Sequence, residues 1–216
     1  MAISAALIKQ LRDRTNAPMM DCKKALEETD GDMDKAIDFL RKKGLADAKK
    51  RAGRVAAEGI VHSYIHGEGR IGVLVEVNCE TDFVARTDQF KTLVHEICLQ
   101  IAASSPLYVR REEVSAAEIA KEEEIRGAQL KDQGKPDKII PKILEGQINK
   151  WYADICLLEQ TYNRDREKTI QDLVNEVTAT TGEKISVRRF VRFEVGEGLE
   201  KRSNDLGAEV AQMLKG

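Results

Sequence analysis

A change of hydrophobic period within residues 71–101 constrains the fold of this chain more than any other feature of its 216 residues. Apolar residues alternate with others along 71–79, which is the period of a half-buried β-strand. Along 90–101 they recur every three to four residues, as on one face of a helix: Phe90, Leu93, Val94, Ile97, Cys98 and Ile101. Because an apolar helix face needs an apolar partner, we expect this helix to cover a sheet that contains the strand.

Two further segments complete the expected sheet. Residues 59–66 alternate in the same way, and residues 67–70, which include two glycines, can join them to the first strand as a hairpin. A third strand is predicted much later in the chain, over residues 184–195. We therefore expect a small antiparallel sheet covered by helices, within a core domain of residues 59–198.

The first 45 residues are expected to form a separate docking module of three helices. Ser4 can cap the first helix, and Pro18 can occupy the first turn of the second. Asp32 can cap the third helix, and Gly44 is expected to end it. A bundle of this size resembles the ubiquitin-associated type, whose usual role is docking onto a partner.

Helices account for most of the remaining sequence. Residues 46–58 are rich in Ala, Lys and Arg and are expected to form a linker. Two mostly polar helices are predicted within residues 115–157, as a helical hairpin that protrudes from the core. Thr169 can cap a further helix that ends at Gly182, and residues 199–216 are expected to form a C-terminal helical module. The predicted fold class is α+β.

The motifs and the composition argue against several functional classes. The sequence has no GxGxxG, phosphate-loop or HExxH motif, so neither an enzyme nor a cofactor is predicted. His62 and His66 would lie about 13 Å apart along a strand, which is too far to bind one metal ion, so no metal is predicted. The net charge of −2 disfavours a nucleic-acid partner held by bulk electrostatics.

Compartment and membrane association follow from the same sequence. No apolar run reaches the roughly 20 residues that cross a bilayer, and residues 1–4 carry no secretory signal, so a cytoplasmic protein is expected. The four cysteines are scattered among apolar residues and are expected to be reduced and buried: Cys22, Cys79, Cys98 and Cys156.

The segment 81–86 is distinctive because the strand alternation stops there. Thr81 and Asp82 can cap a helix, and a large aromatic residue, Phe83, follows directly. Aromatic residues are mostly buried, so one interpretation is that Phe83 packs into its own core. The other is that the turn presents Asp82 and Phe83 to a binding partner. The residues alone leave both interpretations open.

Three separated segments resemble the elongation factor Ts family, the nucleotide exchange factors of the translational GTPase elongation factor Tu. The first is LRDRT at residues 11–15 with MMDCKKAL at 19–26, and the second is GVLVEVNCETDFVA at 72–85. The third is RRFVRFEVGEG at 188–198. The segments occur in the family's order and span nearly the whole chain, whose length resembles the short form of the family.

The resemblance implies a function and a set of site residues. It implies a guanine nucleotide exchange factor that binds elongation factor Tu in its GDP-bound and nucleotide-free forms. Asp82 and Phe83, within a Mg²⁺-displacing segment that runs from Thr81 to Val84, would insert near the partner's Mg²⁺ and phosphate site. The docking surface of the N-terminal module would consist of Arg12, Met19, Met20 and Lys23. The end of the last strand and the terminal helix would contact the partner as well.

The chain departs from the family pattern at two places. Asn16-Ala17-Pro18 replaces a glycine-containing turn before the two methionines, and Thr161-Tyr162 stands where relatives have Pro-Phe. Some short relatives pair through a cysteine in the last strand, near Val191 of this chain, so no such disulfide is expected. A homodimer is left open.

Two other functions are compatible with parts of the sequence. One is a ubiquitin-associated-type adaptor that binds another protein without exchange activity, which the N-terminal module alone would support. The other is a ribosome- or RNA-binding factor that uses Arg188, Arg189 and Arg192. Strand alternation places Arg188 and Arg192 on one face and Arg189 on the other, which weakens the second alternative.

Overall fold

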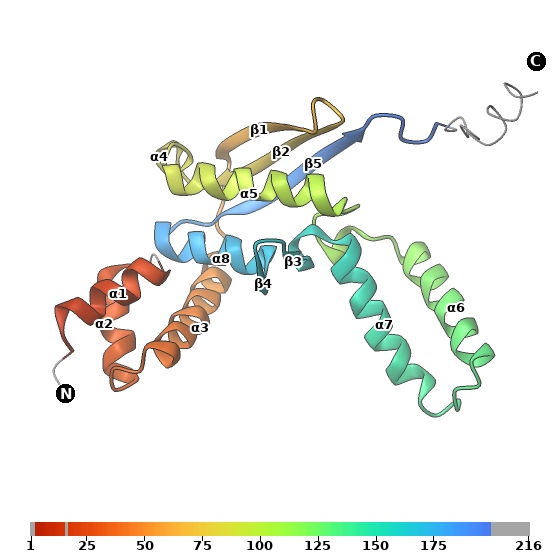
Figure 1. The fold of residues 1–216 in the computed structure, drawn as a ribbon, viewed down its shortest axis with the longest axis horizontal. Coiled ribbons are helices and arrows are strands. Elements are labelled where there is room, and N and C mark those ends of the chain that lie inside the picture. Colours follow the sequence, from red (N-terminus) through yellow and green to blue (C-terminus); the bar gives the residue numbers. More distant parts are fainter. Residues whose placement is uncertain (1–2, 16, 200–216) are drawn as a thin grey trace, which may run out of the picture.

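A computed structural model describes residues 3–15 and 17–199 and shows the predicted α+β fold. Three N-terminal helices lie at one end of the molecule, a sheet with its covering helices forms the middle, and a helical hairpin projects from the other end (Figure 1). The C-terminal helical module predicted for residues 199–216 falls, from residue 200 on, outside the described residues, and so does Asn16.

The central sheet has the three predicted strands. β1 (Glu58–His66), β2 (Ile71–Cys79) and β5 (Ser186–Glu194) are antiparallel, in the order β1-β2-β5. The predicted hairpin turn joins β1 to β2, and its two glycines, Gly67 and Gly69, both have positive φ. The pairing of β2 with β5 shifts by one residue at Glu76, which marks a β-bulge.

Helices cover one face of this sheet. α5 (Asp88–Ser104) packs on β1 and β2, and all six of its predicted helix-face residues are buried. α8 (Ile170–Thr181) completes the core and ends at Gly182, whose φ of 75° is left-handed. The other face leaves five apolar side chains exposed in the described chain: Val61, Ile65, Leu74, Val191 and Phe193.

The N-terminal module consists of α1 (Ala5–Thr15), α2 (Met19–Glu28) and α3 (Met33–Arg51). The predicted caps are present: the Ser4 hydroxyl oxygen accepts from the Leu7 N–H at 3.2 Å, and the Asp32 carboxylate accepts from the Asp34 and Lys35 N–H groups. The small core of the module contains Leu11, Cys22, Ala25, Leu26 and Ala36.

The prediction that Gly44 ends the third helix is wrong, because α3 continues to Arg51. Gly44 is buried against α8, where a Cβ atom would lie 3.5 Å from the Ala179 Cβ. The Arg41 guanidinium adds an ion pair to Asp172 of α8 at 3.1 Å. Packing on α8 therefore outweighs the cost of about 1 kcal/mol for glycine inside a helix.

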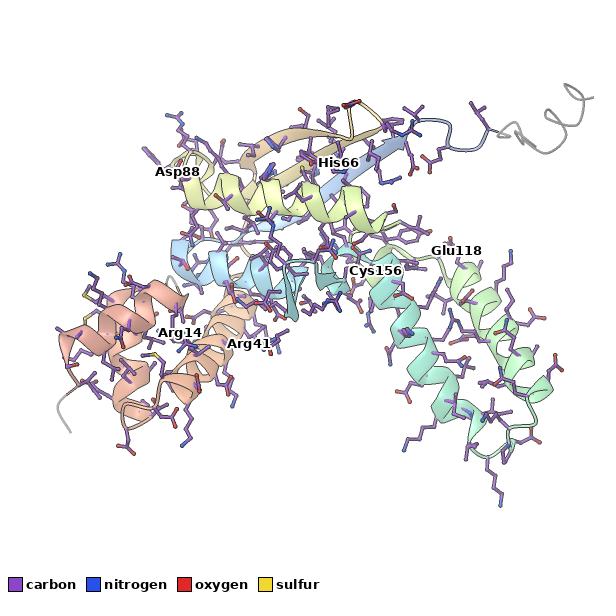
Figure 2. The ribbon with its side chains drawn as sticks, in the orientation of Figure 1. Arg14, Arg41, His66, Asp88, Glu118 and Cys156 are labelled. Atoms are coloured by element: carbon purple, nitrogen blue, oxygen red, sulfur yellow. The ribbon has the colours of Figure 1, made fainter. Side chains whose placement is uncertain are left out.

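The predicted helical hairpin is formed by α6 (Ala116–Asp132) and α7 (Ile140–Ile155). Its base, where Figure 2 labels Glu118 and Cys156, is joined to the core by a bridge between Tyr108 and Cys156. Four short elements were not predicted: η1 (Arg111–Glu113), η2 (Leu157–Glu159), β3 (Thr161–Tyr162) and β4 (Asp165–Thr169). They are too short to show a hydrophobic period.

The four cysteines are free and buried, as predicted. Burial raises the pKa of Cys79 and of Cys156 to about 11 and that of Cys98 to about 12. These thiols fill the core in their protonated form. Within the described ranges, no helix is long and apolar enough to cross a membrane.

Candidate functional site

The segment that follows β2 forms α4 (Asp82–Ala85), a single helical turn at one end of α5 (Figure 1). Thr81 caps it, since its side-chain oxygen accepts from the Val84 N–H at 3.4 Å. Thr87 caps the next helix, whose first residue, Asp88, is labelled in Figure 2. We call residues 81–85 the α4 turn.

Phe83 is the most exposed residue of the α4 turn, with 78% of its surface accessible. Its two successors face inward instead: Ala85 is buried, and Val84 packs against the main core. The interpretation that Phe83 packs into its own core is therefore wrong. The turn holds an aromatic ring in solvent, and such a ring gains free energy when a partner covers it.

Asp82, which precedes Phe83 in the sequence, forms an ion pair with Arg86. The distance between Arg86 Nη2 and Asp82 Oδ2 is 2.7 Å, and the two side chains are 76% and 47% exposed, respectively. Exposed pairs of this kind contribute about 0–1 kcal/mol. Asp82 can therefore exchange Arg86 for a partner's donor at little cost.

The base of the α4 turn is held by the segment that follows α8. The Glu183 carboxylate accepts from the Glu80 N–H at 3.1 Å, the Thr81 N–H at 3.0 Å and the Thr81 hydroxyl at 2.6 Å. In return, the Lys184 N–H donates to Glu80 at 2.6 Å, which, together with Arg54, lowers the pKa of the Glu80 carboxyl. Sequence reasoning missed Glu183, which lies about a hundred positions after Thr81 in the chain. The only signal in the sequence was its place directly after the helix-ending Gly182.

The predicted docking residues all lie on the surface of the N-terminal module. Met19 and Met20 are 53% and 72% exposed, and Arg12 and Lys23 are exposed too. Met19 and Met20 stand four and three positions before Lys23, so these three side chains share one side of α2. The module lies at the same end of the long axis as the α4 turn, opposite the α6–α7 hairpin (Figure 1).

The arginines of β5 are paired in a way that alternation did not predict. Arg188 and Arg189 both contact Glu76, each at 2.7 Å, so the prediction that they lie on opposite faces is wrong. The cause is the β-bulge at Glu76, where Arg188 is the extra residue. These two arginines lower the pKa of Glu76 to about 2, and Arg192 pairs with Glu194 at 2.7 Å. The three charges are largely neutralised within the sheet.

The three histidines of the chain lie on β1 and α5 and contact one another or Tyr64. His62 and His95 stand edge to face with ring centroids 6.1 Å apart, and the Tyr64 hydroxyl lies 2.9 Å from His66 Nδ1. Among residues 3–15 and 17–199, no three His, Cys, Asp or Glu side chains are arranged to hold a metal ion. The arrangement can bind a protein partner through exposed side chains.

Comparison with known proteins gives a consistent result. Residues 48–197, which include the α4 turn, match the family described as Elongation factor TS. A protein named Elongation factor Ts from Desulforamulus reducens is 62% identical over 213 residues, covering 99% of this chain and 98% of that protein. Proteins of the same name from Geobacter metallireducens and Syntrophomonas wolfei are 61% and 58% identical over 211 and 213 residues. They cover 98% and 99% of this chain, and 98% and 100% of their own lengths.

Proposed function

This chain belongs to the elongation factor Ts family, and we propose that it is a guanine nucleotide exchange factor for the translational GTPase elongation factor Tu. The observation that carries the proposal is the solvent-exposed Phe83 ring on a turn whose base is fixed by hydrogen bonds. In this role the protein forms and breaks no covalent bond, so it is not an enzyme and needs no cofactor.

The mechanism follows from thermodynamic reciprocity. A bound guanine nucleotide is held largely by donors around its phosphates and by Mg²⁺. A factor that binds the GTPase more tightly when the nucleotide is absent must weaken nucleotide binding by the same factor. The protein therefore needs contacts that form only when the Mg²⁺ and phosphate site is disrupted. It binds both the GDP-bound and the nucleotide-free GTPase, and the latter more tightly.

Phe83 supplies the largest of these contacts. Complete burial of a phenylalanine side chain contributes about 2–3 kcal/mol. That corresponds to roughly 30- to 150-fold in an equilibrium constant. The ring acts on exchange only if the partner's pocket opens as the residues of the Mg²⁺ site are displaced, and the exposed Phe83 is available to fill it.

Asp82 adds a smaller electrostatic contribution at the same place. A carboxylate next to the inserted ring repels the negatively charged phosphates. It also competes with them for the partner's hydrogen-bond donors near the Mg²⁺ site. Thr81 and Val84 flank the inserted pair and set its direction, because Thr81 caps the α4 turn and Val84 packs into the core. Residues 81–84 thus act together as the segment that displaces Mg²⁺.

The N-terminal module contributes affinity that does not depend on the nucleotide. We propose that residues 1–45 dock onto the GTPase through Arg12, Met19, Met20 and Lys23, which are exposed in the free chain. Docking raises the effective concentration of the α4 turn at its target. It does not by itself favour either nucleotide state.

The ubiquitin-associated-type adaptor remains the alternative function. It accounts for the exposed docking surface but gives no role to Phe83, and a pull-down from a bacterial lysate would separate the two by partner identity. An RNA partner is less well supported, because Arg188 and Arg189 are already paired to Glu76.

We also propose that two copies of the chain pair through the open face of the sheet. This face exposes Leu74, which pairs with Val191 on the next strand, and Phe193, which is 71% exposed. Sheets pack face to face with aligned strands, and a twofold axis would bury the same face of both copies. Sedimentation across protein concentrations tests this; a monomer at every concentration contradicts it, and Leu74→Glu should shift a dimer to monomer.

Stopped-flow release of a fluorescent guanine nucleotide from elongation factor Tu tests the proposed function. We expect the wild-type chain to accelerate release strongly and Phe83→Ala to lose most of that acceleration. Leu107→Ala is the matched control, because it removes a similarly exposed apolar side chain, 68% accessible, that lies beyond the other end of α5. Release at the intrinsic rate in the presence of the wild-type chain would contradict exchange activity.

A further inference from the structure

Glu183 is the residue on which the base of the α4 turn depends. Regular pairing of β2 ends at Cys79 on one side and at Asn78 on the other, so the N–H groups of residues 80 and 81 have no strand partner. The Glu183 carboxylate takes both, with Oε2 at 3.1 Å from the Glu80 nitrogen and 3.0 Å from the Thr81 nitrogen. It thereby takes the place of a neighbouring strand for two residues.

The second carboxylate oxygen fixes the side chain that caps the turn. Glu183 Oε1 accepts from the Thr81 hydroxyl at 2.6 Å, so the hydroxyl proton points toward Glu183. The lone pairs of the Thr81 hydroxyl oxygen are left to accept from the Val84 N–H, whose nitrogen lies 3.4 Å away. Glu183 therefore determines both where Thr81 sits and how its hydroxyl caps α4.

A reciprocal contact closes the junction. Glu80 Oε1 accepts from the Lys184 N–H at 2.6 Å, and Arg54 approaches the same carboxylate at 3.3 Å. The Cys79 thiol donates to the Thr81 carbonyl oxygen at 3.1 Å. Every polar backbone and side-chain group of Thr81 is thus engaged, while Phe83, two residues on, touches solvent.

We infer that Glu183 is a positioning residue for nucleotide exchange: its carboxylate orients the α4 turn so that Phe83 is presented to the partner. This rests on the proposed function. Ordering of the turn before binding removes an entropy cost from the complex in which Phe83 is inserted. Hydrogen bonds to a charged carboxylate are also stronger than neutral ones, so the turn keeps its direction in the free chain.

The test measures nucleotide release from elongation factor Tu over a range of concentrations of the full chain. Glu183→Ala removes all three contacts, whereas Glu183→Gln keeps one acceptor oxygen. We expect Glu183→Ala to lower the maximal release rate about tenfold, since the loss of a charge-assisted hydrogen bond is worth roughly that factor. The half-saturating concentration should stay within about twofold, because the docking surface is untouched.

Four further variants separate positioning from general stability. Glu176→Ala removes a carboxylate within α8, one that pairs with Lys168 at 2.8 Å, and it should leave the maximal rate unchanged. Thr81→Val, which loses the hydroxyl donor, should lose more activity than Thr81→Ser, which keeps it. In the double variant Thr81→Val with Glu183→Gln, the fold loss of maximal release rate should be smaller than the product of the two single fold losses, because both substitutions act through one contact.

The outcomes distinguish this inference from the proposed function beneath it. If Glu183→Ala keeps the full maximal rate while Phe83→Ala loses it, the positioning role is wrong and the function of Phe83 stands. If Phe83→Ala keeps the full rate as well, insertion of the ring is itself wrong. The positioning role is also contradicted if the double variant loses the full product of the two single fold losses in maximal release rate. It is contradicted as well if the lower rate of Glu183→Gln is fully explained by a smaller folded fraction, measured by circular dichroism.

Discussion

The α4 turn and the docking surface differ in how the protein holds them. The α4 turn presents one rigid aromatic ring, and its base is tied by hydrogen bonds to a residue 102 positions later in the chain. The docking surface instead presents Met19 and Met20 on a short helix of a small bundle. Methionine side chains adapt to many contours. A fixed ring can discriminate between two states of a partner, whereas adaptable side chains suit a surface that binds both.

The largest expected effect comes from the α4 turn. Phe83→Ala should lower the maximal release rate roughly 30- to 150-fold, because the burial energy of the ring is lost only where the partner's site is disrupted. Affinity for the GDP-bound GTPase should change far less. Isothermal titration beside stopped-flow release measures both; an equal loss of rate and of affinity would break the contrast between the two regions.

The docking surface should show the opposite behaviour, with a loss of affinity and little change in the maximal release rate. Met20→Ala removes an exposed thioether side chain and should weaken binding by about tenfold, with the maximal release rate nearly restored at high concentration of the factor. The measurement is the release rate as a function of factor concentration. A lowered maximum with an unchanged half-saturating concentration would show that Met20 acts on the nucleotide and not on docking.

Asp82 should have a smaller effect than the ring. Asp82→Asn keeps the shape but removes the charge, and it should lower the maximal release rate by about fivefold, as expected for a single polar contact. Arg86→Ala, which removes the ion-pair partner of Asp82, should change thermal stability little because the pair is exposed. If Arg86→Ala lowers the maximal release rate more than Asp82→Asn does, the ion pair, and not the carboxylate alone, acts in exchange.

The smallest effect at neutral pH is expected where Glu76 of β2 contacts the arginines of β5, and it shows whether a third region binds a partner. The pKa of Glu76 is lowered from its ordinary value of 4.5 to about 2 by Arg188 and Arg189. Its contribution to stability is therefore complete above pH 4.5 and is lost as the pH falls toward 2. Urea unfolding of Glu76→Gln between pH 5 and 2 should show a flatter pH dependence than that of the wild type. Unchanged pH dependence would mean that the arginines are not held by Glu76 and are free to bind a partner.

The elements that the sequence predicted well are long and periodic. α5 carries six apolar residues at helical spacing, and β1 and β2 alternate on both sides of a turn that contains glycines. The structure of such segments is set by their own residues and by burial of one face, so the hydrophobic pattern alone is sufficient to predict them. The short strands β3 and β4, with two and five residues, carry no such pattern.

The features that could not be predicted depend on contacts between distant segments. Gly44 would end an isolated helix, but α8 packs beside it and α3 continues. The β-bulge at Glu76 brings Arg188 and Arg189 to one carboxylate, which strict alternation excludes. Whether Phe83 is buried was undecidable from its type alone, because its exposure follows from the inward packing of Val84 and Ala85.

The central claim is that the Phe83 ring binds better when the partner has lost its nucleotide. The most direct measurement is the affinity of the wild-type chain and of Phe83→Ala for elongation factor Tu, each with GDP bound and with nucleotide removed. The account predicts that the substitution weakens binding to the nucleotide-free form by roughly 30- to 150-fold and changes binding to the GDP form by only a few-fold. Equal weakening of both complexes would contradict it.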